Sequence, residues 1–170
     1  ETFIGSDFDV TFLPAPLRAP VEGNWLAVPW AEDAEQTRAV LAGASAPDWL
    51  LVDHYGIDAK WERGVAGNNT HVMVIDDRSD RRHACTLLLN QNLCAQGKDY
   101  AELIDPRTQV LAGVSYALVR PEFAALRPAA LARRENLFPT GGNLLISMGG
   151  TDAGDATGTV LERIAAIGLP

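Results

Sequence analysis

Three short apolar runs, each stopped abruptly by polar residues, constrain the fold of this chain most strongly. They are Asp48-Trp-Leu-Leu-Val-Asp-His-Tyr55, His71-Val-Met-Val-Ile-Asp-Asp77 and Asn143-Leu-Leu-Ile-Ser-Met-Gly-Gly-Thr-Asp152. None alternates strictly between apolar and polar side chains, so the runs suit strands that are covered on both faces. Helical patterns separate them. The sequence therefore predicts an α/β fold of Rossmann-like parallel βα units.

Composition limits the class of partner. The 170 residues are 47% hydrophobic and carry 14 basic against 22 acidic side chains, for a net charge of −8. That balance gives no electrostatic footprint for nucleic acid or an anionic membrane. Cys85 and Cys94 are too few for a disulfide framework and lack the partners of a zinc site. With neither a membrane-spanning run nor a secretory signal pattern, we expect a cytoplasmic protein.

The remaining pattern predicts further elements and a connector. Strands are expected at residues 10–13, 25–28, 85–89 and 109–112, and helices at 33–42, 58–65, 121–132 and from Thr151 or Asp152 to 167. Asp33 with Gln36 resembles a capping box at the start of the first helix. Residues 133–142 are polar and contain proline and glycine, which indicates a connector.

Several unusual strings occur in the same order as in a known family. They are residues 48–59, 72–77, Asp80-Arg-Arg-His83, 87–92, Ser115-Tyr-Ala-Leu-Val-Arg-Pro-Glu-Phe123 and 146–152. Over about residues 48–167 the chain thereby resembles the UDP-sugar hydrolases of pseudaminic acid biosynthesis, which hydrolyse UDP-2,4-diacetamido-2,4,6-trideoxy-β-L-altropyranose. Residues 1–47 match only loosely.

The resemblance implies a glycosyltransferase-B-like architecture, in which two Rossmann-like domains face each other across a nucleotide-sugar cleft. Residues 1–132 would be part of the N-terminal domain, 133–142 the connector, and 143–170 the start of the C-terminal nucleotide-binding domain. The implied reaction converts a UDP-linked sugar to UDP and free sugar. Water attacks the anomeric carbon with inversion, and neither a metal nor a cofactor is involved.

One departure from the family is serious. The family begins with a strand and a Gly-x-Gly-His-x-x-Arg loop, whose histidine acts on water. The histidines of this chain are His54, His71 and His83, and none follows Gly-x-Gly. We therefore expect an inactive fragment that lacks its first βα units and nearly all of its second domain. Two alternatives stay open: a glycosyltransferase of the same architecture that uses a UDP-sugar donor, and a non-catalytic nucleotide-sugar-binding module.

Polar residues at the ends of the predicted strands are candidate site residues, because open parallel sheets bind ligands there. The resemblance gives Tyr55 an active-site role near the sugar, and a phenolic hydroxyl can hold a sugar hydroxyl or a water. For Asp53 we favour a helix cap or a loop hydrogen bond over catalysis. For His54 we favour a satisfied, partly buried side chain over catalysis, and His54 is kept as a candidate substrate contact. Asn90 and Asn92 would present amides to the sugar or simply form turns.

Two further candidates come from the recognisable strings. Tyr116 belongs to the 115–123 string and is a possible substrate contact. The turn Met148-Gly149-Gly150-Thr151-Asp152 is the best phosphate candidate, because glycines let backbone N–H groups approach an anion at a helix N-terminus. Alternatively, these residues form an ordinary βα turn that binds no ligand.

The remaining polar and aromatic residues have simpler interpretations. Asp76 and Asp77 resemble a paired acid and base or a metal site, but we favour caps and ion pairs with the nearby arginines. The four tryptophans are assigned to packing rather than to sugar stacking.

Overall fold

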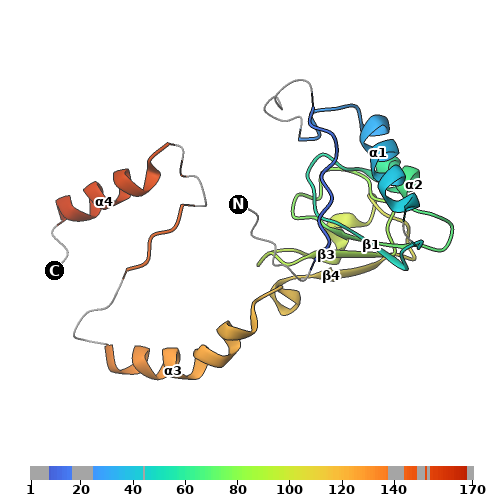
Figure 1. Ribbon diagram of the computed structural model, residues 1–170. Coiled ribbons are helices and arrows are strands. Elements are labelled where there is room, and N and C mark those ends of the chain that lie inside the picture. The colour runs from blue at the N-terminus through green and yellow to red at the C-terminus, as the bar shows by residue number, and fades with distance from the viewer. Residues whose placement is uncertain are drawn as a thin grey trace. The chain divides into compact units, whose positions relative to one another are not determined.

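The computed structural model describes residues 8–16, 25–43, 45–137, 144–148, 152 and 154–167. The chain divides into two compact units, Glu1–Leu118 and Val119–Pro170 (Figure 1). No helix in the described part of the chain is long and apolar enough to cross a membrane.

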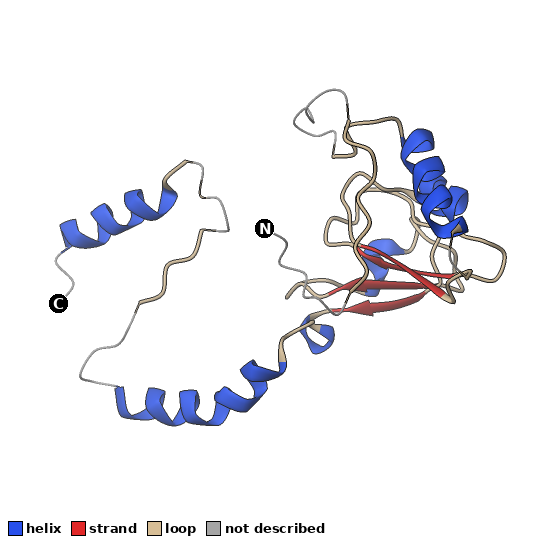
Figure 2. Ribbon diagram, in the orientation of Figure 1, coloured by secondary structure: helices blue, strands red, loops and turns tan. Residues whose placement is uncertain are grey.

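The first unit is built on a four-stranded parallel sheet (Figure 2), which confirms the predicted α/β fold. Its strands are β1 (Trp49–Val52), β2 (His71–Ile75), β3 (Leu87–Asn90) and β4 (Gln109–Ala112), and they lie in the order of the sequence. Pairing places Trp49 opposite His71, and Leu87 opposite both Met73 and Gln109. Because all strands are parallel, the carboxyl ends of neighbouring strands meet at one edge of the sheet.

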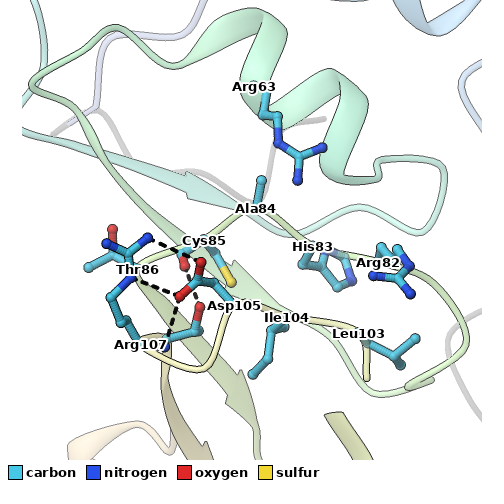
Figure 3. Close-up of a pocket in the computed structure, with 11 residues that line it drawn as sticks. Arg63, Arg82, His83, Ala84, Cys85, Thr86, Leu103, Ile104, Asp105 and Arg107 are labelled. Carbon is cyan, nitrogen blue, oxygen red and sulfur yellow. Dashed lines mark hydrogen bonds and ion pairs between the residues drawn. The ribbon is translucent and has the colours of Figure 1, made fainter. Parts of the chain in front are cut away.

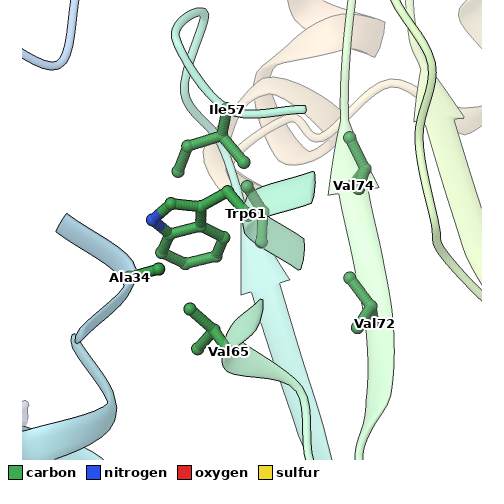
Figure 4. Packing of buried hydrophobic residues seen from close by; sticks show 7 residues of the cluster. Ala34, Ile57, Trp61, Val65, Val72 and Val74 are labelled. Atoms are coloured by element: carbon green, nitrogen blue, oxygen red, sulfur yellow. The ribbon is translucent and has the colours of Figure 1, made fainter. Parts of the chain in front are cut away.

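Two helices, α1 (Trp30–Ala42) and α2 (Ala59–Val65), pack over β1 and β2. Asp58 caps α2, since its carboxylate accepts the backbone N–H groups of Lys60 and Trp61 at 2.8 and 3.3 Å. Figure 4 shows the core beneath the helices, which consists of Ala34, Val52, Ile57, Trp61, Val65, Val72 and Val74. Burial of these apolar side chains holds the helices on the sheet.

Shorter elements complete both units. In the first, the 3₁₀ helix η1 (Gly97–Tyr100) brings Tyr100 into the interior, and η2 (Val114–Tyr116) follows β4 after Gly113, whose φ of +99° suits glycine. The second unit contains α3 (Pro121–Leu137) and α4 (Ala156–Ile167). None of the side chains described in these two helices is buried.

Three predicted strands are wrong. Residues 10–13, 25–28 and 144–148 have strand-like composition, but the structure gives them no strand conformation. A strand also needs a neighbour to pair with, and the described sheet consists of β1 to β4 alone. The first of these segments is followed by Pro14 and Pro16, which lack an N–H group for a ladder.

Several predicted boundaries also differ. The capping box at Asp33 is wrong, because α1 already begins at Trp30 and the Asp33 carboxylate instead accepts the indole N–H of Trp61 at 2.7 Å. The strand expected from residue 85 begins at Leu87. Helix α3 continues to Leu137, so the first five residues of the expected connector are helical. The expected N-cap of the last helix is also wrong, because α4 begins at Ala156 and Asp155 precedes it, accepting the Gly158 N–H at 3.2 Å. Asp152 lies further upstream and accepts the N–H groups of Ala156 and Thr157 at 2.9 and 3.0 Å.

Candidate functional site

A cavity of about 180 Å³ lies at the carboxyl ends of β1, β2 and β3. Each of the three strand ends contributes to its wall. The lining residues are Asp53, Tyr55, Ile75, Asp76, Asp77, Gln91 and Asn92. We call this cavity the carboxyl-end cleft. It stands where open parallel sheets bind their ligands.

Tyr55 forms the rim of the carboxyl-end cleft. Its hydroxyl donates to Asp77 Oδ2 at 3.2 Å. Its ring lies 5.4 Å from the ring of Trp25 and 5.7 Å from the Arg78 guanidinium. The hydrogen bond and the charge of Asp77 raise the pKa of Tyr55, so the phenol stays protonated near neutral pH. The cleft thus presents a neutral hydroxyl that can donate or accept.

The Asp76 carboxylate is the hub behind the cleft, and its side chain is fully buried. Its Oδ2 atom accepts the backbone N–H groups of Arg78 and Ser79 at 3.3 and 2.9 Å, and the Tyr100 hydroxyl at 2.9 Å. The first two bonds fold the loop after β2 into a turn. This turn fixes the backbone that carries Asp77 to the rim.

Two cations balance the buried carboxylates. Arg81 Nη1 lies 2.7 Å from Asp76 Oδ1, and His83 Nε2 lies 3.8 Å from the same atom. On its other side, His83 Nδ1 is 2.6 Å from Glu62 Oε1, while the second oxygen of Glu62 accepts the Ala84 N–H. Helix α2 is therefore tied to the loop after β2 by charge as well as by apolar packing.

The pKa shifts follow from these contacts. Burial of His83 opposes its protonation, but the carboxylates of Asp76 and Glu62 outweigh burial and raise its pKa to about 9. Burial also opposes ionisation of Asp76, yet His83, the Ser79 N–H and Arg81 together lower the pKa of that carboxyl well below its usual range. At neutral pH His83 is therefore an imidazolium held between the carboxylates of Glu62 and Asp76.

The network continues to the opposite wall of the cleft. Asn90 Nδ2 donates to the Tyr100 hydroxyl at 3.0 Å, and Asn90 Oδ1 accepts the Asn92 N–H at 3.1 Å. Because Tyr100 also donates to Asp76, one buried chain of hydrogen bonds joins the ends of β2 and β3. It positions Asn92 at the cleft.

The structure brings some of the sequence-predicted site residues together and separates others. Tyr55 and Asn92 line the cleft, and Asn90 is buried behind it. His54 does not line it, because its Nδ1 atom accepts the backbone N–H two residues later at 3.1 Å. Tyr116 lies in η2, exposed and outside the cleft lining.

The predicted phosphate turn belongs to the second unit. Met148 is exposed and Asp152 accepts the N–H group of Ala156, the first residue of α4, while Gly149, Gly150 and Thr151 lie outside the described residues. Its role as a phosphate site stays a prediction.

Sequence reasoning missed most of the residues that hold the cleft in shape. Glu62, His83 and Tyr100 were not singled out, and Trp25 was assigned to packing although it is 52% exposed and contacts Tyr55. One signal was available for Glu62, which sits beside Trp61 on a short helix that must bury one face. By contrast, the expected ion pair between Asp76 and a nearby arginine is confirmed by Arg81.

The acidic side chains that line the cleft do not form a metal site in the described part of the chain. Among the residues that the structure describes, no group of three or more His, Cys, Asp or Glu side chains could hold a metal ion. The chemistry that the cleft offers is hydrogen bonding from a phenol, amides and carboxylates, which suits a polar ligand.

Comparison with known proteins adds a relative. No family model matches the sequence. The chain is 35% identical over 103 residues to the UDP-2,4-diacetamido-2,4,6-trideoxy-beta-L-altropyranose hydrolase of Campylobacter jejuni. The match covers 61% of this chain and 35% of that protein, so the chain spans about a third of its relative's length. These values support a relationship at family level to a protein named as a nucleotide-sugar hydrolase.

Proposed function

We propose that this chain carries the sugar-facing part of an enzyme that hydrolyses a UDP-linked diacetamido-trideoxy sugar to UDP and free sugar. The observation that carries the proposal is the carboxyl-end cleft, whose Tyr55 rim is held by the buried Asp76 hub. The named activity of the Campylobacter jejuni relative supplies the substrate class.

The size of the cleft supports a partial site. Pockets for whole organic ligands measure about 300–1,000 Å³, whereas this cleft has about 180 Å³. It suits one sugar ring rather than a complete nucleotide sugar. Tyr55 would hold a sugar hydroxyl, and the amide of Asn92 would pair with an acetamido group.

No histidine is among the described residues that line the carboxyl-end cleft. His54 is bonded to its own loop, His71 is the first residue of β2, and His83 is buried between two carboxylates. Water attack on the anomeric carbon must break the bond to UDP while a base takes the proton of the water. We therefore expect the 170-residue chain to bind the sugar without releasing UDP.

The test is a titration of the isotope-labelled chain with UDP-2,4-diacetamido-2,4,6-trideoxy-β-L-altropyranose, followed by NMR. We expect saturable shifts at Asp53, Asp77 and Asn92, and about tenfold weaker binding in Tyr55→Phe, which loses the proposed hydrogen bond to the sugar. Tyr116→Phe removes the same hydroxyl outside the cleft lining and serves as the matched control. Equal weakening in both variants, or no shift at the cleft, would overturn the proposal.

An assay of released UDP separates this function from its alternatives. Turnover that vanishes in His54→Ala would show that the chain contains its own water-activating group. Release of UDP only with an added acceptor alcohol would instead identify a transferase.

A further inference from the structure

A second cavity lies at the other end of the sheet, at the amino ends of β3 and β4 (Figure 3), and has a volume of about 540 Å³. Three arginines from separate segments line it: Arg63 from α2, Arg82 from the loop before β3, and Arg107 from the loop before β4. We call it the amino-end cavity. It shares none of its lining residues with the carboxyl-end cleft.

The three guanidinium groups are not equivalent. Arg107 is bound twice by Asp105, through Nε to Oδ1 at 2.9 Å and Nη2 to Oδ2 at 3.1 Å, as Figure 3 shows. The guanidinium groups of Arg63 and Arg82 make no hydrogen bond or ion pair with any residue that the structure describes. Two positive charges at this cavity are therefore uncompensated locally.

Such a concentration of charge stands out in an acidic chain. The protein carries 22 acidic and 14 basic side chains. Among the described residues that line the amino-end cavity, Asp105 is the one carboxylate, and Arg107 already neutralises it. His83 also lines the cavity, but its charge is shared with Glu62 and Asp76. The cavity thus offers a local binding site for an anion within a chain whose overall field repels anions.

We propose that the amino-end cavity binds the phosphate monoester group of a small organic molecule. A phosphate monoester carries close to two negative charges above its second pKa of about 6, which matches the two unpaired guanidinium groups. Guanidinium donors are planar and suit the paired oxygens of a phosphate. Leu103 and Ile104 supply apolar wall for the organic part, and the volume is in the range of ligand pockets.

The test uses phenyl phosphate as the probe and the complete 170-residue chain as the target. In NMR titrations we expect saturable shifts of the N–H groups of Ala84, Cys85 and Ile104, with unaltered signals at Tyr55 and Asn92. Inorganic phosphate should shift the same groups with lower affinity, because it leaves the apolar wall empty. Phenol, which lacks the charge, should not bind.

Substitutions assign the binding to the two arginines. Arg63→Gln and Arg82→Gln should each weaken phenyl phosphate binding about tenfold, the effect of losing one charged hydrogen bond. Arg38→Gln removes the same charge from an exposed position on α1 and should leave the affinity unchanged. Arg63→Lys and Arg82→Lys, which keep the charge but lose the planar fork, provide a second series if a glutamine variant fails to fold.

Two outcomes would overturn the proposal. One is the absence of saturable shifts at the amino-end cavity. The other is an equal loss of affinity in Arg38→Gln, which would assign binding to net charge alone. Neither outcome bears on the nucleotide-sugar proposal, because that proposal is tested through signals at the opposite end of the sheet.

Discussion

The charged side chains at the two ends of the sheet differ in burial and in the number of partners that they contact. At the carboxyl end, Asp76 is buried among Arg81, His83 and Tyr100, so every member of the network constrains another. At the amino end, the carboxylate–arginine pair of Asp105 and Arg107 is exposed and local, two residues apart in sequence. Charge that is linked and buried fixes a geometry. Charge that is exposed stays available to a ligand or to solvent.

The largest expected difference in stability is between two variants that each lose a carboxylate, one at each end of the sheet. Asp76→Ala leaves Arg81 and His83 without their shared partner, and loss of one member of a buried ion pair costs about 3–5 kcal/mol of unfolding free energy. Asp105→Ala breaks an exposed pair, and we expect no measurable change in stability. Urea unfolding of both variants checks the comparison. Similar stabilities would mean that the buried network does not hold the carboxyl end.

The dependence of stability on pH should come from the same network. The pKa of His83 is about 9 in the folded protein against 6.5 for a free imidazole. The stabilisation is complete below pH 6.5 and is lost as the pH rises towards 9, because the unfolded chain releases its proton first. Asp76, whose pKa is lowered, contributes stability that is lost as the pH falls below about 4.

Urea unfolding between pH 6 and about 9.5 measures the alkaline part of this profile. In the wild-type protein, the free energy of unfolding should fall over this range as His83 loses its proton. In His83→Gln this decrease should be absent, because glutamine does not titrate. An unchanged profile in that variant would place the titrating group elsewhere.

Two tyrosines at the carboxyl end donate hydrogen bonds to the adjacent residues Asp76 and Asp77. Removing each hydroxyl tests how much the burial of a hydrogen bond adds to stability. Tyr100→Phe removes a buried hydroxyl that donates to Asp76 and accepts from Asn90, and should cost about 1–3 kcal/mol. Tyr55→Phe removes an exposed hydroxyl bonded to Asp77 and should leave the melting temperature nearly unchanged. A larger loss for Tyr55→Phe would make the rim, rather than the hub, the stabilising part.

The smallest effect concerns the two thiols. Cys85 lines the amino-end cavity, where burial raises its pKa to about 12, so little thiolate forms at neutral pH. Cys94 is exposed. Brief treatment with iodoacetamide at pH 8 should therefore modify Cys94 first, as peptide mass spectrometry would show. Equal modification would mean that the amino end opens more readily than its packing indicates.

The sequence predicted those parts of the fold that depend on local pattern. The runs 49–52 and 71–75 have strand propensity, and they are β1 and β2. The expected cover on both faces is wrong for β1, because it is an edge strand on which Trp49 and Leu51 are exposed. Residues 10–13 have a similar composition but no paired neighbour in the described sheet, and pairing cannot be inferred from a segment alone. Asp33 failed as a cap for the same reason, because its partner is Trp61, 28 residues away.

The candidate site divides in the same way. Tyr55 and Asn92 were predictable because polar residues that follow parallel strands face the ligand edge. Glu62 and Tyr100 were not, because their partners lie 21 and 24 residues away and belong to different elements. Side chains that form a site follow the strand ends, whereas those that hold it rigid are chosen by three-dimensional packing.

The order of the strands has a consequence for how the protein is made. Each strand of the sheet pairs with the strand that follows it in the sequence, and no later segment inserts between two earlier ones. The paired residues of neighbouring strands lie 14 to 22 positions apart in the sequence, so each pairing loses less loop entropy than a pairing of distant segments would. As the chain leaves the ribosome, β2 therefore finds β1 already available, β3 finds β2, and β4 finds β3. The sheet between Trp49 and Ala112 can therefore grow during synthesis by adding each new strand to the edge formed by the previous one.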